Sequence, residues 1–209
     1  PVTASDAGKV LRLELVSDNG ILYQSYVGSE FGVWKFLISL YFGEIIIAAI
    51  VFLISVLTIL FSTIYGILNK HPMDIVYLGY AGMLSAVWLD MNSIFRQVMF
   101  PNVSVASEIP FYMVMLIPFP VIIYMNEIQE HRFEKLYHFV GIFMGTVDVI
   151  SCILYITGIK GLVSTFIFVT MGCFLAITSV VYTFFEDLYS RKIQEYRFVA
   201  FGLFGAFVC

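Results

Sequence analysis

The residues that could do chemistry in this chain gather in the stretch 79–102, where polar side chains interrupt an apolar run. Asp90, Ser93 and Gln97 recur at i, i+3 and i+7, so in a helix they share one face. A neighbouring face carries three more: Trp88, Asn92 and Arg96. Polar groups at membrane depth need protein or water partners, so this stretch predicts a helix surrounded by other helices.

Asp148, in GTVDVIS, is the deepest carboxylate that the sequence predicts. Its expected partners are Arg96 and the amide-rich face of the preceding polar stretch. Two interpretations remain open for Asp90, Ser93, Arg96, Gln97 and Asp148 together. They are either a buried polar cluster that fixes helix register, or a signalling, ligand or ion site that switches.

Two further patterns concern helix geometry. Pro118 and Pro120, in LIPFPVII, each remove a backbone donor and predict a kink, which is a candidate hinge. Two pairs of small residues four apart predict close helix packing, without saying whether the neighbour belongs to the same chain. These pairs are Gly141 with Gly145 and Gly172 with Ala176.

The sequence contains no Gly-rich phosphate loop, nucleophile elbow or zinc motif. No catalytic residue, cofactor site or metal site is therefore predicted, and the three histidines lack metal-ligand spacing on one helix. No basic, aromatic-interleaved surface favours nucleic acid. The mixed-charge segment NEIQEHRFEKLYH (126–138) is expected to be a solvated helix end.

The composition determines which elements must position these residues. The 209 residues are 60% hydrophobic and only 12% charged. That is far more apolar than a soluble domain of this size needs, and it predicts an all-α polytopic membrane protein. Five full crossings and a partial sixth are expected: Ile45–Leu68, Ile75–Met99, Ile109–Met125, Phe139–Thr157, Leu162–Phe185, and a last one that starts near Phe198.

The first 33 residues differ from the rest. Val10–Val16 alternates apolar and polar residues, Ser17–Gly20 is a turn signal, and Ile21–Val27 could pair as a second strand. We expect residues 1–33 to be the last β-hairpin of an extracytoplasmic sandwich-like domain, with a disordered leader as the alternative. Residues 34–44 are then a connector, and residues 45–209 a helical domain cut within its sixth helix.

The charge bias of the short loops favours an extracytoplasmic N-terminus. The predicted inner loops hold six cations: Lys70, Arg132, Lys135, Arg191, Lys192 and Arg197. Pro1 at the start and the apolar end at Cys209 indicate a piece of a longer protein, and Cys152, Cys173 and Cys209 are expected to be buried hydrophobes.

Three phrases carry a resemblance to a family: VGSEFGVWKFL, AVWLDMNSIFRQVMFPN and MLIPFPVIIYMNEI. With the layout, they resemble the bacterial seven-transmembrane receptors with diverse intracellular signalling modules. More narrowly, they resemble the membrane region of GGDEF diguanylate cyclases of that architecture.

The resemblance implies seven helices in the full-length protein, in the bacterial inner membrane. It also implies a small-molecule ligand, often a carbohydrate, on the outer domain, a homodimer, and a cytoplasmic output domain. That output would be a cyclic-di-GMP-forming GGDEF cyclase or, in other relatives, a histidine kinase. The segment itself would have no enzymatic activity. A secondary transporter is the alternative from another class, although no later helix repeats the Pro118 and Pro120 break.

Overall fold

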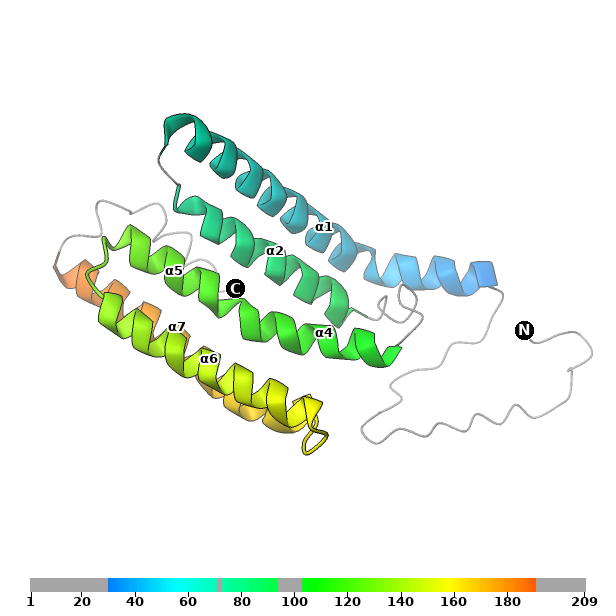
Figure 1. Ribbon diagram of the computed structural model, residues 1–209. Coiled ribbons are helices and arrows are strands. Elements are labelled where there is room, and N and C mark those ends of the chain that lie inside the picture. The colour runs from blue at the N-terminus through cyan, green and yellow to red at the C-terminus, as the bar shows by residue number, and fades with distance from the viewer. Residues whose placement is uncertain (1–29, 71–72, 94–102, 191–209) are drawn as a thin grey trace, which may run out of the picture. The chain divides into compact units, whose positions relative to one another are not determined.

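The computed structural model describes residues 30–70, 73–93 and 103–190, and every regular element in these ranges is an α-helix (Figure 1). The helices are α1 Glu30–Asn69, α2 Ile75–Asn92, α4 Val103–Leu116, α5 Pro118–Ile128, α6 Glu134–Ile156 and α7 Leu162–Tyr189. The predicted β-hairpin, the sixth crossing and Cys209 lie outside the described residues.

Four segments in the described part of the chain are long and apolar enough to cross a membrane: Ile38–Asn69, Ala106–Ile128, Glu134–Ile156 and Leu162–Tyr189. They correspond to the first, third, fourth and fifth predicted crossings. Their outward faces are rich in exposed Phe, Ile and Leu side chains, as expected of helices that contact lipid. The chain is therefore an α-helical membrane protein.

The chain divides into two units, residues 1–39 and 40–209. The described part of the first unit, Glu30–Ser39, is entirely helical. The predicted connector at 34–44 thus lies within α1. The remaining helices and the rest of α1 belong to the second unit, which contains every site discussed below.

Helix α2 is shorter than the predicted crossing Ile75–Met99. It ends at Asn92, and Ser93 has extended dihedrals, φ −70° and ψ 153°. Helical periodicity therefore places Asp90 on α2 but not Ser93. The i, i+3 argument for a shared face stops at this residue, because the backbone has already left the helix.

Helices α1 and α2 approach closely at two glycines. A Cβ atom at Gly82 would lie 2.4 Å from Ser55 Oγ, and one at Gly79 would lie 2.7 Å from Ile59 Cγ1. Only the missing side chains leave room for α1 at this point. The two glycines of GYAG thus work as small residues do in other membrane helix pairs.

Helices α4 and α5 form one apolar segment with an interruption at Ile117. The dihedrals of Ile117 remain helical, φ −54° and ψ −43°, and its N–H donates to Met113 O at 2.9 Å. Pro118 and Pro120 follow without backbone N–H groups. The predicted kink is therefore a local weakening of the helix ladder and not a sharp corner.

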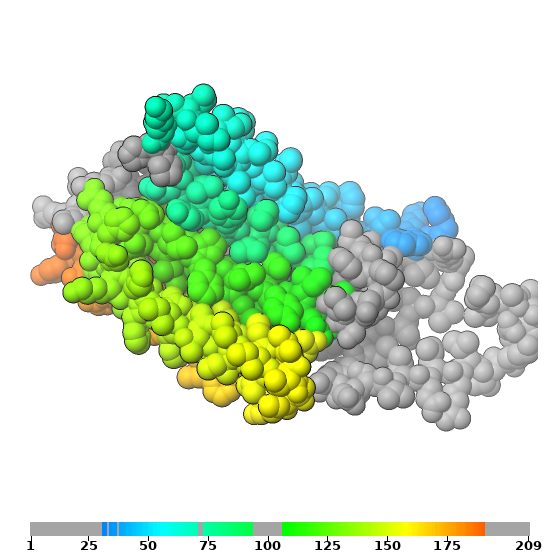
Figure 2. All heavy atoms as spheres, viewed as in Figure 1, coloured from blue at the N-terminus to red at the C-terminus, as the bar shows by residue number. Residues whose placement is uncertain are grey.

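The core lies where α5, α6 and α7 meet. One cluster of buried side chains joins Ile122 and Met125 of α5 to residues of the two later helices: Tyr137, Val140, Met144, Ala176 and Val180. A second cluster joins α4 to α7 through Met115, Leu162 and Val169. In Figure 2, the green atoms of α4 and α5 lie between α2 on one side and α6 on the other.

The small-residue pairs have different environments. Gly172 faces α6, because a Cβ atom added to it would lie 3.4 Å from Met144 Cγ. Ala176 is buried in the first cluster. This pair therefore packs α7 against α6 of the same chain. Gly145 reaches only Phe119 at 3.9 Å, and Gly141 has nothing within 4 Å. The close approach predicted for Gly141 is not made within the described residues.

Candidate functional site

The turn between α5 and α6 has an unusual backbone. Glu130 and His131 are consecutive non-glycine residues with positive φ, 51° and 57°. Each such residue costs about 1–3 kcal/mol and persists only where its surroundings enforce it. The His131 N–H closes the turn by donating to Asn126 O at 2.9 Å. The two residues that enforce the turn are its immediate neighbours, Gln129 and Arg132.

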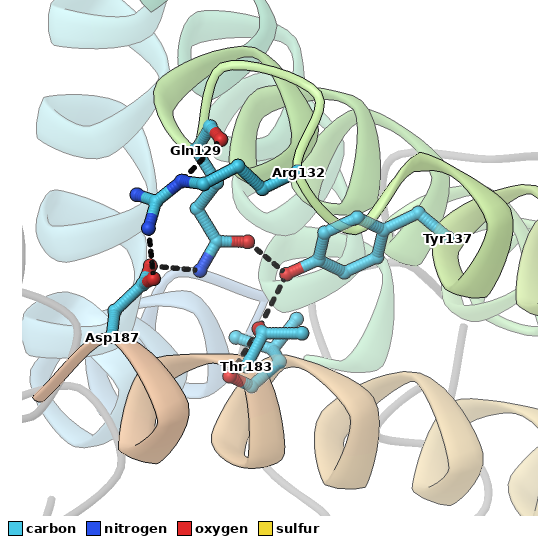
Figure 3. A network of polar contacts seen from close by, with 6 residues as sticks. Gln129, Arg132, Tyr137, Thr183 and Asp187 are labelled. Atoms are coloured by element: carbon cyan, nitrogen blue, oxygen red, sulfur yellow. Dashed lines mark hydrogen bonds and ion pairs between the residues drawn. The ribbon is translucent and has the colours of Figure 1, made fainter. Parts of the chain in front are cut away.

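Both neighbours bind the same carboxylate on α7. Arg132 Nη1 donates to Asp187 Oδ1 at 2.5 Å, and Gln129 Nε2 donates to Asp187 Oδ2 at 2.9 Å. Arg132 Nε also donates to Gln129 O at 3.0 Å, within the turn. The last turns of α7 are therefore fixed to the α5–α6 turn by an ion pair and an amide hydrogen bond (Figure 3).

Two hydroxyl groups extend this network toward the core. The Tyr137 hydroxyl lies 2.7 Å from Gln129 Oε1 and 2.6 Å from Thr183 Oγ1. Because the Gln129 amide nitrogen donates to Asp187, its Oε1 must accept, so Tyr137 donates there. Thr183 then donates either to Tyr137 or to Val180 O, 3.0 Å away. The donors thus point toward Asp187 along the chain of contacts.

Burial makes these contacts energetically important. Gln129 and Thr183 are fully buried, Asp187 is 1% exposed and Tyr137 is 3% exposed, while the Arg132 side chain retains 21%. Removing one member of a buried pair leaves the other charge uncompensated, which typically costs about 3–5 kcal/mol. We define these five residues, Gln129, Arg132, Tyr137, Thr183 and Asp187, as the latch network.

The rim of the turn carries additional polar groups. His131 lies 3.3 Å from Glu127 Oε2 through Nε2 and 2.8 Å from Asn126 Nδ2 through Nδ1. Asn126 Oδ1 and Arg132 Nη2 are buried and have no hydrogen-bond partner within the described ranges. The turn thus holds one fully bonded carboxylate and, beside it, two polar atoms that gain no bond in this arrangement.

Three of the five residues of the predicted polar cluster, Asp90, Ser93 and Asp148, lie in the described part of the chain. Asp148 is half-buried on α6, and its Oδ2 atom is buried without a hydrogen-bond partner among the described residues. Asp90 is half-buried at the end of α2, and Ser93 is buried just after it. Arg96 and Gln97, the predicted partners, lie outside the described residues.

A separate polar contact occurs near the other end of α6, where the Tyr155 hydroxyl donates to Glu108 Oε1 of α4. Cys152 lies one turn before Tyr155 on α6 and packs with the second apolar cluster. Within the described ranges no three His, Cys, Asp or Glu side chains lie close enough to hold a metal ion.

Sequence reasoning missed the latch network. The expectation of a solvated helix end at 126–138 is wrong for Gln129 and Tyr137, which are buried against α7. One signal could have indicated it. The predicted topology places the loops that contain Arg132 and Asp187 on the same side of the membrane, where opposite charges can pair. Mixed charge in the loop concealed it, since such composition is also typical of solvated turns.

No protein-family model, curated protein or solved structure matches the chain. The function must therefore be argued from the geometry described above.

Proposed function

We propose that this chain is the membrane-embedded transducer region of a bacterial signalling receptor, which relays an extracytoplasmic binding event to an output domain beyond α7. The observation that carries the proposal is the latch network, which ties the end of α7 to the α5–α6 turn through a buried ion pair. A transducer needs an element with two discrete arrangements. A buried pair at a strained turn favours such behaviour, because partly broken intermediates leave buried charge unpaired.

In this mechanism the latched arrangement holds α7 in one position. Release would separate Arg132 and Gln129 from Asp187, let Glu130 and His131 relax from positive φ, and free α7 to shift. A ligand can favour either arrangement only by the difference between its affinities for the two. The described contacts thus give the proposal a defined element on which a signal could act.

The remaining parts of the proposal rest on the resemblance of the sequence phrases to the seven-transmembrane receptors. They are a small-molecule ligand such as a carbohydrate on the outer domain, a homodimer in the bacterial inner membrane, and a GGDEF diguanylate cyclase as output. The latch network supports a relay in general and not one output chemistry.

The test begins with the gene that encodes this segment in its natural protein. We expect the encoded protein to continue to a seventh membrane crossing and then a GGDEF domain. A protein without any signalling domain would overturn the proposal. Cells that produce the full-length protein are then assayed for cyclic di-GMP with Asp187→Asn and Arg132→Ala. We expect basal output to change about fivefold or more in both variants, the lower range of allosteric couplings.

The matched control is Lys135→Ala, which removes an exposed cation three residues from Arg132. It should leave output unchanged, and all three variants should insert in equal amounts. Unchanged output in both latch variants, at normal insertion, would remove the latch network from signal transfer.

A further inference from the structure

A cavity of about 480 Å³ lies beside the break between α4 and α5. Its walls come from α2, from both sides of the break, and from one face of α7. The lining residues that matter here are Val114, Pro118 and Ile122 on one side and Cys173, Ala176 and Val180 on the other. The side chains that line it are almost entirely apolar.

The break lacks two backbone donors, because neither Pro118 nor Pro120 has an N–H. Pro118 has no N–H to donate to Val114 O, the acceptor four residues earlier. The Cys173 thiol of α7 lies 3.8 Å from that oxygen and donates to it. A weak thiol hydrogen bond thus replaces a backbone bond at the point where α5 begins.

Helix α5 is therefore held differently at its two ends. At Pro118 it has a weakened backbone, a thiol contact and an adjacent cavity. At Ile128, about 15 Å further along the helix axis, it leads directly into the latch network. On α7 the same order appears, because Val180 lines the cavity and Asp187 lies two turns further on.

From this juxtaposition we propose that α5 is a lever that pivots at Pro118 into the cavity and thereby opens or closes the latch network. Motion toward the cavity slides Ile122 past Ala176 and Val180, which pack against it, into unfilled space. It also carries Gln129 and Arg132 relative to Asp187. The Cys173 contact to Val114 O holds the lever in the latched position. This inference rests on the proposed function for its purpose, but the motion itself can be measured without any signalling output.

The test is amide hydrogen exchange of residues 127–132 in the membrane-reconstituted protein, read by mass spectrometry. Ala176→Leu fills the cavity and should slow exchange at this turn about threefold or more, because opening becomes rarer. Pro118→Ala restores the N–H to Val114 O and should slow it likewise. Cys173→Ala removes the thiol contact and should speed exchange by a similar factor.

Thr178→Leu is the control, because Thr178 is exposed on the same helix two residues from Ala176. It should not change exchange at the turn. Pro118→Ala keeps the test decisive if Ala176→Leu does not fold, since it introduces no added bulk. Unchanged or faster exchange at the turn in the folded variants among Ala176→Leu and Pro118→Ala would overturn the lever. Slower exchange with unaltered output would retain the lever and reject the signalling role.

Discussion

Asp187 and Asp148 both lie in apolar helices long enough to span a membrane, yet they differ in burial and in hydrogen bonding. Asp187 is almost fully buried and accepts hydrogen bonds from Arg132 and Gln129. Asp148 is half-buried, and its buried Oδ2 has no hydrogen-bond partner in the part of the chain that the structure describes. The difference shows that the position of a carboxylate along a helix does not determine its partners, which depend on the donors that other segments bring close to it.

The largest effect is expected for Arg132→Ala. The substitution leaves Asp187 buried without its cation and should destabilise the protein by about 3 kcal/mol, at the lower end for buried pairs because Arg132 is partly exposed. Thermal unfolding in detergent measures the loss. Lys135→Ala should change stability by less than about 0.5 kcal/mol. The double variant Arg132→Met with Asp187→Leu should recover part of the loss, although the buried Gln129 Nε2 then lacks its acceptor. A double variant less stable than Arg132→Ala would contradict an uncompensated Asp187 charge as the cause of the loss.

Tyr137→Phe should have the next largest effect. It removes the only donor to Gln129 Oε1 among the described contacts and leaves a buried amide oxygen unbonded, which costs about 1–2 kcal/mol. The same unfolding assay measures it. A loss below about 0.3 kcal/mol would contradict the donor order assigned to the network.

Thr183→Val tests that order from the other side. Because Tyr137 donates to Gln129 and not to Thr183, removal of the threonine hydroxyl should cost less than the tyrosine substitution, about 0.5–1 kcal/mol. If Thr183→Val destabilises the protein more than Tyr137→Phe does, Tyr137 must instead donate to Thr183.

Asp148→Asn should have the smallest effect, within about 1 kcal/mol and of either sign, because it removes a charge whose buried oxygen makes no hydrogen bond. A loss above about 2 kcal/mol would show that Asp148 has a strong partner. That result would remove the contrast with Asp187 and favour the predicted role of Asp148 in a polar cluster.

The sequence determined much of the fold. Long apolar runs must become helices in a membrane, because only intrahelical bonds satisfy the backbone there. Four of the expected crossings therefore correspond to apolar helical spans, with ends shifted by a few residues. Pro118 also marked the interruption between α4 and α5, because a missing N–H weakens the ladder in any context.

Tertiary structure alone decided the rest. Nothing local in the sequence distinguishes Gln129 on a solvated turn from Gln129 buried against α7, since the difference lies in residues more than fifty positions away. The partner of a charge is likewise a property of helix packing, as Asp187 and Asp148 show. Local sequence thus specifies which segments become helices, while the long-range approach of α5, α6 and α7 decides which polar groups meet.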